Sequence, residues 1–192
     1  MIKVELIEST GNDEELINNE FNKSVMFTTN LKKDENLIKY MSLGVDNARL
    51  KFLIKAPIYI AEELSKYQTG LVRNDIIKDY NAEAEYKPEI YKPDVWKEYR
   101  EEPLQTTRSY NTIMESCKIL YQLLREEGIP AEKAKMVLPH NTMTEWYWSG
   151  TLFGFTRFCN MRNIKTTKCE VTDKIKNTLK ERFPKTTQYV LD

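Results

Sequence analysis

The sequence predicts a single α+β domain over residues 1–192, with a central, mostly antiparallel sheet packed by helices and a helical C-terminal half. Two observations carry this prediction. Apolar and polar residues alternate near the start of the chain, as in half-buried strands, and apolar residues recur at helical spacing beyond residue 107. Strands followed by helices are typical of the α+β class. With 41% hydrophobic and 30% charged residues, the chain can bury one sizeable core.

The composition limits the expected partners and location. Lys and Arg total 29, as do Asp and Glu, so the net charge is zero and no broad nucleic-acid-binding surface is expected. No stretch reaches the roughly 18–20 apolar residues of a membrane helix, and the acidic start lacks the features of a signal peptide. Cys117, Cys159 and Cys169 have no C-x-x-C spacing. We therefore expect a cytoplasmic protein with reduced thiols and no metal site.

Two segments of the first half are predicted as strands. Residues 1–9 alternate, with Ile2, Val4 and Leu6 on one face. The stretch ARLKFLIKAPIYI alternates in the same way before Pro57, which suits the first turn of a helix. The remaining predictions for this half are the inner face of the second strand (Leu50, Phe52, Ile54), helices at 12–22, 33–41 and 58–68, and a loop over 81–107.

The longest predicted helix covers about residues 108–127, and Gly128 stands at its expected C-terminal stop. Its apolar stripe consists of Tyr110, Ile113, Met114, Cys117, Leu120, Tyr121 and Leu124. Three further helices follow: a short one between Pro130 and Pro139, an aromatic-rich one from Thr144 to about Met161, and a last one over 165–182. The last helix is predicted to bury Val171, Ile175, Leu179 and Phe183.

Several common catalytic scaffolds are excluded by inspection. The chain contains no G-x-G-x-x-G, P-loop, G-x-S-x-G or H-E-x-x-H pattern. Arg157 and Arg162 stand in an otherwise apolar stretch, where an arginine needs an anionic or carbonyl partner. A substrate phosphate or pyrimidine would serve, and so would an internal carboxylate such as Glu170, which is the more common arrangement. The residues alone leave both alternatives open.

Three other features have an ordinary interpretation when taken alone. Lys66 and Lys78 resemble surface lysines, and His140, the only histidine, is typical of an exposed loop residue. The Trp146-Tyr147-Trp148 triplet has the chemistry to stack on a base or a flavin ring. Such triplets more often belong to a core or to a subunit interface.

Two regions in one ungapped register resemble a known family. The first begins with AKMVLP at 134–139 and continues through Thr144 and the aromatic triplet to FCNMR, which ends at Arg162; Glu170 follows eight residues later. The second is FLIKAPIY at 52–59. Together they are similar to flavin-dependent thymidylate synthases, whose motifs read A-R-x-V-L-P and F-L-x-x-R. The resemblance extends over roughly residues 41–183.

The family's signature is altered in this chain. In the ungapped register, Lys66-Tyr67-Gln68 stands for R-H-R, while Asn74 replaces a glutamate, Ile76 a serine and Lys78 the final arginine. A slip of one residue instead aligns Asn74 with an asparagine and Tyr80 with a tyrosine, and both registers remain open. Of the family's H-x-T-P-F-E element only the acidic Asp46 is kept. Thr151 and Arg157 replace two flavin-facing asparagines.

The resemblance implies a homotetramer that binds FAD and dUMP at subunit interfaces. Its expected reaction moves a one-carbon unit from methylene-tetrahydrofolate to C5 of the pyrimidine, with NADPH as reductant. The implied substrate-binding residues are Arg162, Lys135, Lys78 and Asn74; the implied cofactor-binding residues are Lys66, Gln68, Asp46, Thr151 and Arg157. No catalytic residue is identified. The altered signature leaves two alternatives: hydroxymethylation of dUMP or dCMP, and a non-catalytic nucleotide-binding protein that lost FAD.

Overall fold

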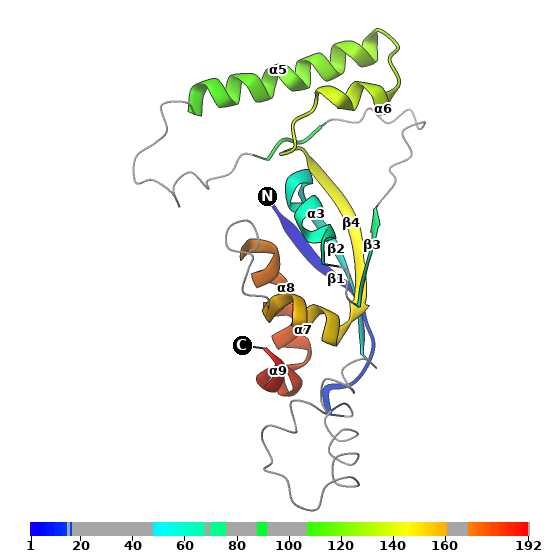
Figure 1. Cartoon of the computed structure of the whole chain (residues 1–192), viewed down its shortest axis with the longest axis vertical. Coiled ribbons are helices and arrows are strands. Elements are labelled where there is room, and N and C mark those ends of the chain that lie inside the picture. Colours follow the sequence, from blue (N-terminus) through cyan, green and yellow to red (C-terminus); the bar gives the residue numbers. More distant parts are fainter. Residues whose placement is uncertain are drawn as a thin grey trace, which may run out of the picture. The chain divides into compact units, whose positions relative to one another are not determined.

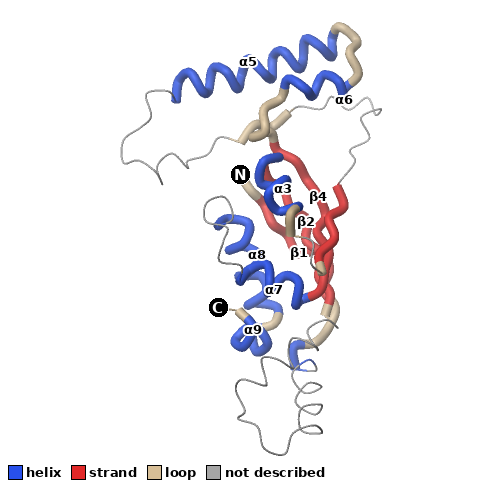
Figure 2. Tube along the Cα trace, viewed as in Figure 1, coloured by secondary structure: helices blue, strands red, loops and turns tan. Residues whose placement is uncertain are grey.

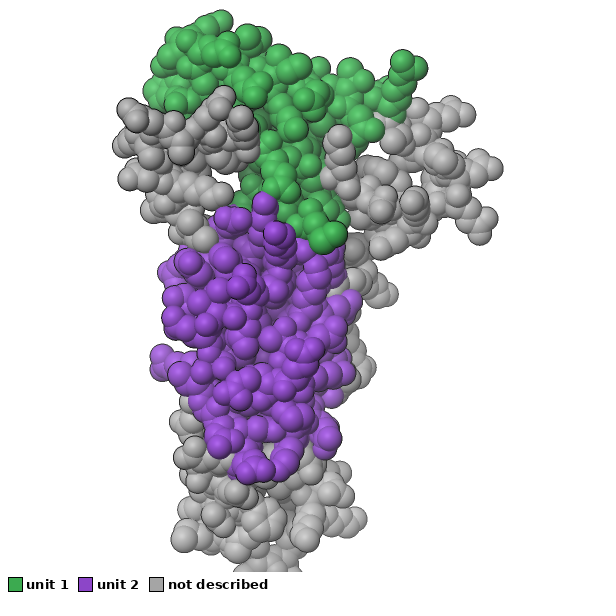
Figure 3. All heavy atoms as spheres, turned by 180° about the vertical axis from the view of Figure 1, so that it is seen from behind, with its two compact units in different colours: residues 1, 56–61, 77–144 green, residues 2–55, 62–76, 145–192 purple. Residues whose placement is uncertain are grey.

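The computed structural model describes residues 1–14, 16, 48–67, 70–75, 88–91, 107–160 and 169–191. These residues group into two compact units, coloured separately in Figure 3. Unit 1 comprises residues 1, 56–61 and 77–144, and unit 2 comprises residues 2–55, 62–76 and 145–192. The expectation of a single domain stays a prediction. None of the described helices has both the length and the apolar character needed to cross a membrane.

A four-stranded sheet in the order β1-β2-β4-β3 lies mainly in unit 2 (Figure 1). The strands are β1 (Lys3–Ser9), β2 (Arg49–Pro57), β3 (Leu71–Asp75) and β4 (Met143–Thr151). β1 pairs antiparallel with β2, and β3 with β4. The Leu152 N–H donates to the Ala48 carbonyl at 2.8 Å, and the Ile58 N–H to the Thr142 carbonyl at 2.9 Å. Because these bonds join the end of one strand to the start of the other, β2 and β4 are also antiparallel.

The inner face of β2 confirms the predicted alternation. Leu50, Phe52 and Ile54 are buried, while the residues between them are only partly covered. The β1–β2 register shifts between Leu6 and Glu8, so one extra residue of β1 bulges from the ladder. Helix α3 (Ile58–Ser65) begins directly after Pro57, as predicted, and ends three residues earlier than expected.

The predicted helix from Thr144 to Met161 is wrong over its first half. Residues 143–151 form strand β4, and helix α7 (Leu152–Asn160) begins only afterwards. Trp146 and Trp148 are buried on one face of β4, whereas Tyr147 between them is only half-buried. This is the two-residue period of a strand, which aromatic side chains favour. A short aromatic-rich run satisfies helical and strand patterns equally well, so tertiary pairing decided between them.

Three helices complete unit 2: α7, α8 (Cys169–Arg182) and α9 (Pro184–Val190). In Figure 2, α7 and α8 lie on the same side of the sheet. The Phe155 ring of α7 lies 4.9 Å from the Phe52 ring of β2 and 5.5 Å from Trp148 of β4, both edge-on. Helix α8 buries Val171, Ile175 and Leu179, and Phe183 directly after it is buried as well, as predicted. The aromatic contacts therefore fix α7 on the inner face of the sheet.

Two elements of unit 2 were not anticipated from the sequence. β3 lies within the altered signature, where no strand was predicted. Helix α9 starts with Pro184 at its first turn, a signal that the sequence displays. Of the predicted helix 12–22, residues 13, 14 and 16 are helical and residue 12 is not. Residues 15 and 17–22 and the predicted helix 33–41 lie outside the described residues.

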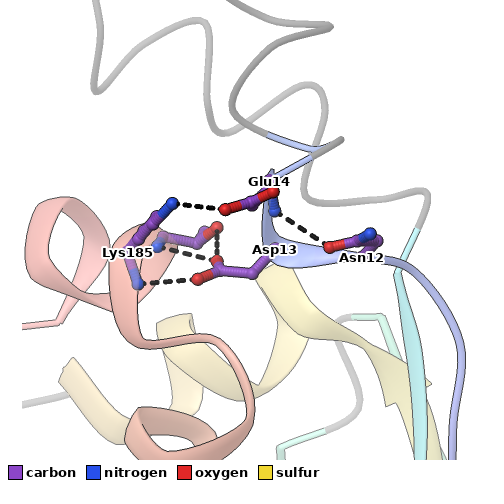
Figure 4. A network of polar contacts seen from close by, with 5 residues as sticks. Asn12, Asp13, Glu14 and Lys185 are labelled. Atoms are coloured by element: carbon purple, nitrogen blue, oxygen red, sulfur yellow. Dashed lines mark hydrogen bonds and ion pairs between the residues drawn. The ribbon is translucent and has the colours of Figure 1, made fainter.

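A carboxylate from the N-terminal segment caps α9 (Figure 4). The Asp13 carboxylate is buried and accepts hydrogen bonds from the Lys185 N–H at 2.7 Å, the Thr186 N–H at 2.9 Å and the Thr186 hydroxyl at 2.5 Å. The first N–H groups of a helix have no partner within the helix. Asp13 thus satisfies two of them across 172 residues of sequence and holds the two ends of the chain together.

We expect Asp13→Ala to lower the free energy of unfolding by about 1–3 kcal/mol, because it leaves buried donors of α9 without an acceptor. Urea unfolding of the full chain measures the change. Glu14→Gln is the matched control: Glu14 pairs with the Lys185 ammonium at 2.7 Å, but this pair is exposed and should matter far less. Equal losses for both variants would show that the buried cap is not what stabilises this junction.

Unit 1 contains the longest described helix, α5 (Thr107–Glu126), as predicted. The Gly128 N–H donates to the Arg125 carbonyl and the Ile129 N–H to the Leu124 carbonyl, which is the bonding pattern of a Schellman cap. Gly128 has φ +83°, which glycine adopts without strain. The short helix after Pro130 is also confirmed, as α6 (Ala131–Ala134) followed by the 3₁₀ turn η2 (Lys135–Val137).

Candidate functional site

The junction of β3, β4 and α7 depends on close backbone approach. A Cβ at Gly150 would collide with the Gly70 carbonyl oxygen and lie 2.5 Å from Leu71 Cδ2. A Cβ at Gly154 would lie 3.0 Å from the same two atoms. Glycine is therefore required where the end of β4 and the start of α7 cross the beginning of β3.

Thr151, a predicted cofactor-side residue, lies at this junction. Its hydroxyl oxygen accepts the Gly154 N–H at 3.0 Å, which caps the N-terminus of α7. Its own N–H donates to the Gly70 carbonyl at 3.2 Å. The position of Thr151 is thus fixed by both its backbone and its side chain, while the hydroxyl proton has no acceptor among the described residues.

A cavity of about 460 Å³ opens beside Thr151 within unit 2. This volume falls in the usual range for small-molecule sites. The described residues that line it are Glu8, Thr10, Arg49, Leu50, Gly70, Val72, Ser149, Gly150 and Thr151. Thr151 is the one lining residue that the sequence analysis had predicted to belong to a binding site. The others come together only because β1 and β4 end where β2 and β3 begin.

Arg157, the second predicted cofactor-side residue of this region, is exposed on α7. It makes no ion pair or hydrogen bond with another described residue. Glu170, the suggested internal partner, instead pairs with the Lys174 ammonium at 2.7 Å. The internal ion pair between Arg157 and Glu170 is therefore not found. Arg162, for which the same alternative was considered, lies outside the described residues.

The altered signature begins with a lysine that already has a partner. The Lys66 ammonium lies 2.5 Å from the Glu63 carboxylate, and the bond and charge of Glu63 raise the pKa of Lys66 above its usual value. The next residue, Tyr67, packs its ring 5.9 Å from the Phe158 ring of α7. In the ungapped register Tyr67 takes the place of the family's histidine, so this position contributes an aromatic contact to the core of unit 2.

The predicted substrate-binding residues are described only in part. Asn74 is exposed on β3, opposite Tyr147 of β4. Lys135 is half-buried in the η2 turn of unit 1. Neither lines the cavity beside Thr151. Lys78 belongs to the part of the chain that the structure does not describe, as do the predicted cofactor-side residues Gln68 and Asp46.

A second polar group forms in unit 1, next to the lone histidine. The Asn141 amide donates to the Tyr91 carbonyl at 2.9 Å and to the Tyr110 hydroxyl. Burial raises the pKa of Tyr110 above its usual value. His140 is exposed, and its carbonyl accepts the Tyr59 N–H. These bonds attach the loop after Pro139 to its neighbours. Within the described residues, no three His, Cys, Asp or Glu side chains gather in an arrangement able to hold a metal ion.

Two hydrogen-bond donors among the described residues have the chemistry to bind FAD. FAD carries two phosphates and a ring with carbonyl and N–H groups. The Arg157 guanidinium, without a described partner, suits an anionic group, and the Thr151 hydroxyl has a proton to donate. Lys66 is less suited, because Glu63 already compensates its charge.

Comparison with known proteins identifies the family of the chain. A family model described as "thymidylate synthase complementing protein" matches residues 5–185. A flavin-dependent thymidylate synthase of Thermus thermophilus is 26% identical over 199 residues, covering 94% of this chain and 72% of the relative. The corresponding protein of Thermosipho melanesiensis is 29% identical over 175 residues, covering 80% and 74%.

The fold is shared with solved structures. The structure of a UMP/dUMP methylase, PolB from Streptomyces cacaoi, bound with 5-Br dUMP, superposes with a TM-score of 0.74 at 18% identity. The match covers 98% of this chain and 94% of that one. The predicted α+β class is thereby confirmed. Because the family model spans most of the chain, from β1 to α9, the protein belongs to the thymidylate synthase complementing family, that of the flavin-dependent thymidylate synthases, as a member with an altered signature.

Proposed function

We propose that the chain is a thymidylate synthase-like enzyme that transfers a one-carbon unit from methylene-tetrahydrofolate to C5 of dUMP. The observation that carries this proposal is the family match over residues 5–185, which includes both the altered signature and the motif ending at Arg162. The cavity beside Thr151 supports it, since its volume suits a small molecule. NADPH is the proposed reductant, and FAD, when bound, supplies the electron transfer.

The chain's own residues have distinct proposed tasks. Arg162 recognises the pyrimidine base through its planar, bidentate guanidinium. Lys135 and Lys78 act as point charges near the nucleotide's phosphate, a role in which lysine replaces arginine without loss of charge, and Asn74 completes the substrate side. On the cofactor side, Arg157 and Thr151 supply a cation and a hydroxyl donor.

A second candidate function is nucleotide binding without catalysis. Two residues of the altered signature favour it, because each already has a partner within the chain. Lys66 pairs with Glu63, and Tyr67 packs against Phe158. Both residues are therefore engaged inside the chain, in the register where the family carries R-H-R. Each lost charged donor lowers affinity for a polyanionic cofactor by about 1.5–3 kcal/mol. Hydroxymethylation of dUMP or dCMP remains a variant of the first proposal.

Two measurements on the full chain separate these candidates. Calorimetric titration is expected to show binding of dUMP, with dCMP and dTMP as comparisons; no heat with any of the three would contradict both candidates. After loading with FAD and removal of the excess, the enzyme is expected to keep a flavin absorption band near 450 nm, roughly the position common to flavins. A chain that binds dUMP but stays colourless would support the non-catalytic candidate.

If flavin is retained, product analysis resolves the remaining variant. The enzyme is supplied with methylene-tetrahydrofolate, NADPH and either dUMP or dCMP, and the nucleotide products are identified by mass spectrometry. A methylated dUMP product is the expected result. A hydroxymethylated product from either nucleotide would correct the reaction while leaving the nucleotide site in place.

A further inference from the structure

The cavity beside Thr151 contains an arginine to which no role has been given so far. Arg49 is the first residue of β2 and lines this cavity. It is exposed, and its guanidinium makes no ion pair or hydrogen bond with another described residue. It lies outside both the altered signature and the motif that ends at Arg162. A guanidinium without a described partner, beside a cavity of ligand size, is suited to bind an anion.

The backbone of Arg49 is held from both sides. Its N–H donates to the Thr10 hydroxyl oxygen at 3.1 Å, and its carbonyl accepts the Thr10 N–H at 2.8 Å. On the other side, the bond from the Leu152 N–H to the Ala48 carbonyl joins the neighbouring residue of β2 to the end of β4. The Arg49 side chain therefore starts from a fixed position at the cavity, which lowers the ordering cost of binding a ligand.

The pairing of β2 with β4 places Arg49 next to Thr151. The two backbone bonds that join these strands fit one antiparallel register, in which Arg49 lies directly opposite Thr151. Side chains at directly opposite positions of neighbouring strands share one face of the sheet and lie within reach of each other. The Arg49 guanidinium and the Thr151 hydroxyl are thus placed to contact one and the same group of a ligand.

Two hydroxyl groups at the cavity still have a proton to donate. The Thr10 hydroxyl oxygen accepts the Arg49 N–H, and the Thr151 hydroxyl oxygen accepts the Gly154 N–H at 3.0 Å. Neither hydroxyl donates to another described residue. Because a hydroxyl carries one donor besides its acceptor sites, both remain free to donate to a ligand. Together with the guanidinium, they make this end of the cavity rich in hydrogen-bond donors.

The cavity also has one carboxylate among its described lining residues, and that charge is already compensated. Glu8 lies 3.6 Å from the Lys51 ammonium, which also lies 4.8 Å from the centre of the Tyr147 ring. Lys51 is not part of the described lining. The charge of Glu8 is therefore offset from outside the lining, which leaves the positive charge of Arg49 uncompensated. A cation beside hydroxyl donors favours an anionic oxygen group, such as a phosphate or a carboxylate.

From this geometry we propose that Arg49, together with the hydroxyls of Thr10 and Thr151, binds an anionic group of the ligand that occupies this cavity. The group is a phosphate, carried by dUMP and FAD, or a carboxylate, carried by the folate. The inference rests on the proposed function for the choice of these ligands, and it adds a binding residue outside the motifs. It supplies an uncompensated cation to a chain whose signature residue Lys66 is paired with Glu63.

The first test is calorimetric titration of the full chain with dUMP, FAD and methylene-tetrahydrofolate in turn. Arg49→Gln is expected to raise the dissociation constant of at least one ligand by about 10-fold, the low end for loss of a charged donor because Arg49 is exposed. Arg49→Lys should recover part of the affinity, since it keeps the charge and loses the planar fork. The ligand that is weakened identifies the anion as a phosphate or a carboxylate.

Lys3→Gln is the matched control for this titration. Lys3 is exposed at the other end of β1 and does not line the cavity, so its neutralisation should leave all dissociation constants unchanged. Equal losses in Arg49→Gln and Lys3→Gln, unchanged constants in Arg49→Gln, or no binding of any ligand to the natural chain would each overturn the proposal.

Failure of the proposed reaction gives a different pattern. A ligand that binds through Arg49, in a chain that forms no methylated or hydroxymethylated nucleotide, would overturn the reaction and leave the Arg49 site in place. A modified nucleotide product, with ligand affinities that Arg49→Gln does not change, would overturn the Arg49 site and leave the reaction in place.

The second test locates the anion without any substitution. Phenylglyoxal reacts with exposed guanidinium groups, and mass spectrometry of the digested chain measures the reaction at each arginine. The ligand identified by titration is expected to abolish most of the modification of Arg49. It should leave the modification of Arg108, which is exposed on α5, unchanged. Equal modification of Arg49 with and without the ligand would overturn the proposal.

Discussion

Trp148→Ala is expected to lower the free energy of unfolding by about 3–5 kcal/mol, the usual loss for a large buried aromatic residue. Trp148 is 2% exposed, and its ring lies 5.5 Å from Phe155 and 4.9 Å from Phe158, both edge-on. Its removal would open a cavity between β4 and α7 that the aromatic rings cannot refill. Since whole domains are stable by only about 5–15 kcal/mol, the variant is expected to be close to unfolded. Urea unfolding followed by circular dichroism measures the change.

Tyr147→Ala is the matched control for this result. Tyr147 is the preceding residue on the same strand, points to the opposite face, is only half-buried and carries the Lys51 ammonium 4.8 Å from its ring centre. Its loss should cost much less than that of Trp148. The difference depends on the two-residue period of β4, so similar losses at positions 147 and 148 would contradict the strand.

Arg162→Ala is expected to raise the dissociation constant for dUMP by about 10- to 150-fold. This range corresponds to the loss of hydrogen bonds from a charged group, about 1.5–3 kcal/mol. Arg162→Lys should recover only part of the affinity, because an ammonium lacks the planar pair of donors that a base edge can accept. Calorimetric titration with dUMP measures both variants.

Lys133→Ala provides the control for that titration. Lys133 is exposed on α6, two residues before the proposed phosphate contact Lys135. Its substitution by alanine removes one positive charge and changes no residue of the proposed site. Its dissociation constant should stay close to that of the unaltered chain. If Arg162→Ala and Lys133→Ala bind dUMP equally well, the role proposed for Arg162 is wrong.

Regular periodicity explains the elements that the sequence predicted well. The alternation through Leu50, Phe52 and Ile54, and the four-residue spacing of Val171, Ile175 and Leu179, each leave one consistent set of buried faces. Gly128 ended α5 for a local reason, since its positive φ closes the helix without a Cβ in the way. Such signals act within one element and need no knowledge of the rest of the chain.

The errors arose where two elements had to meet. Residues 143–151 contain an aromatic run that either period accommodates, and only pairing of β4 with β2 and β3 makes it a strand. β3 is five residues long and has no strong alternation of its own. Its place is set by contact, since Gly150 and Gly154 admit the β3 backbone where a Cβ would not fit. Short elements buried by their neighbours escape prediction for this reason.

The sequence by itself determined the family, the α+β class and the identity of the charged residues proposed to bind nucleotide, because motif spacing and residue chemistry are properties of the chain alone. The tertiary structure alone decided what several of those residues do. In the structure the Thr151 hydroxyl caps the N-terminus of α7, and the Lys66 ammonium pairs with the Glu63 carboxylate. The Tyr67 ring packs against Phe158, and Glu8, Thr10 and Arg49 line a cavity. The Thr151 and Lys66 bonds are local, but the contact of Tyr67 with Phe158 and the lining of the cavity join residues far apart in the chain, which only tertiary packing brings together.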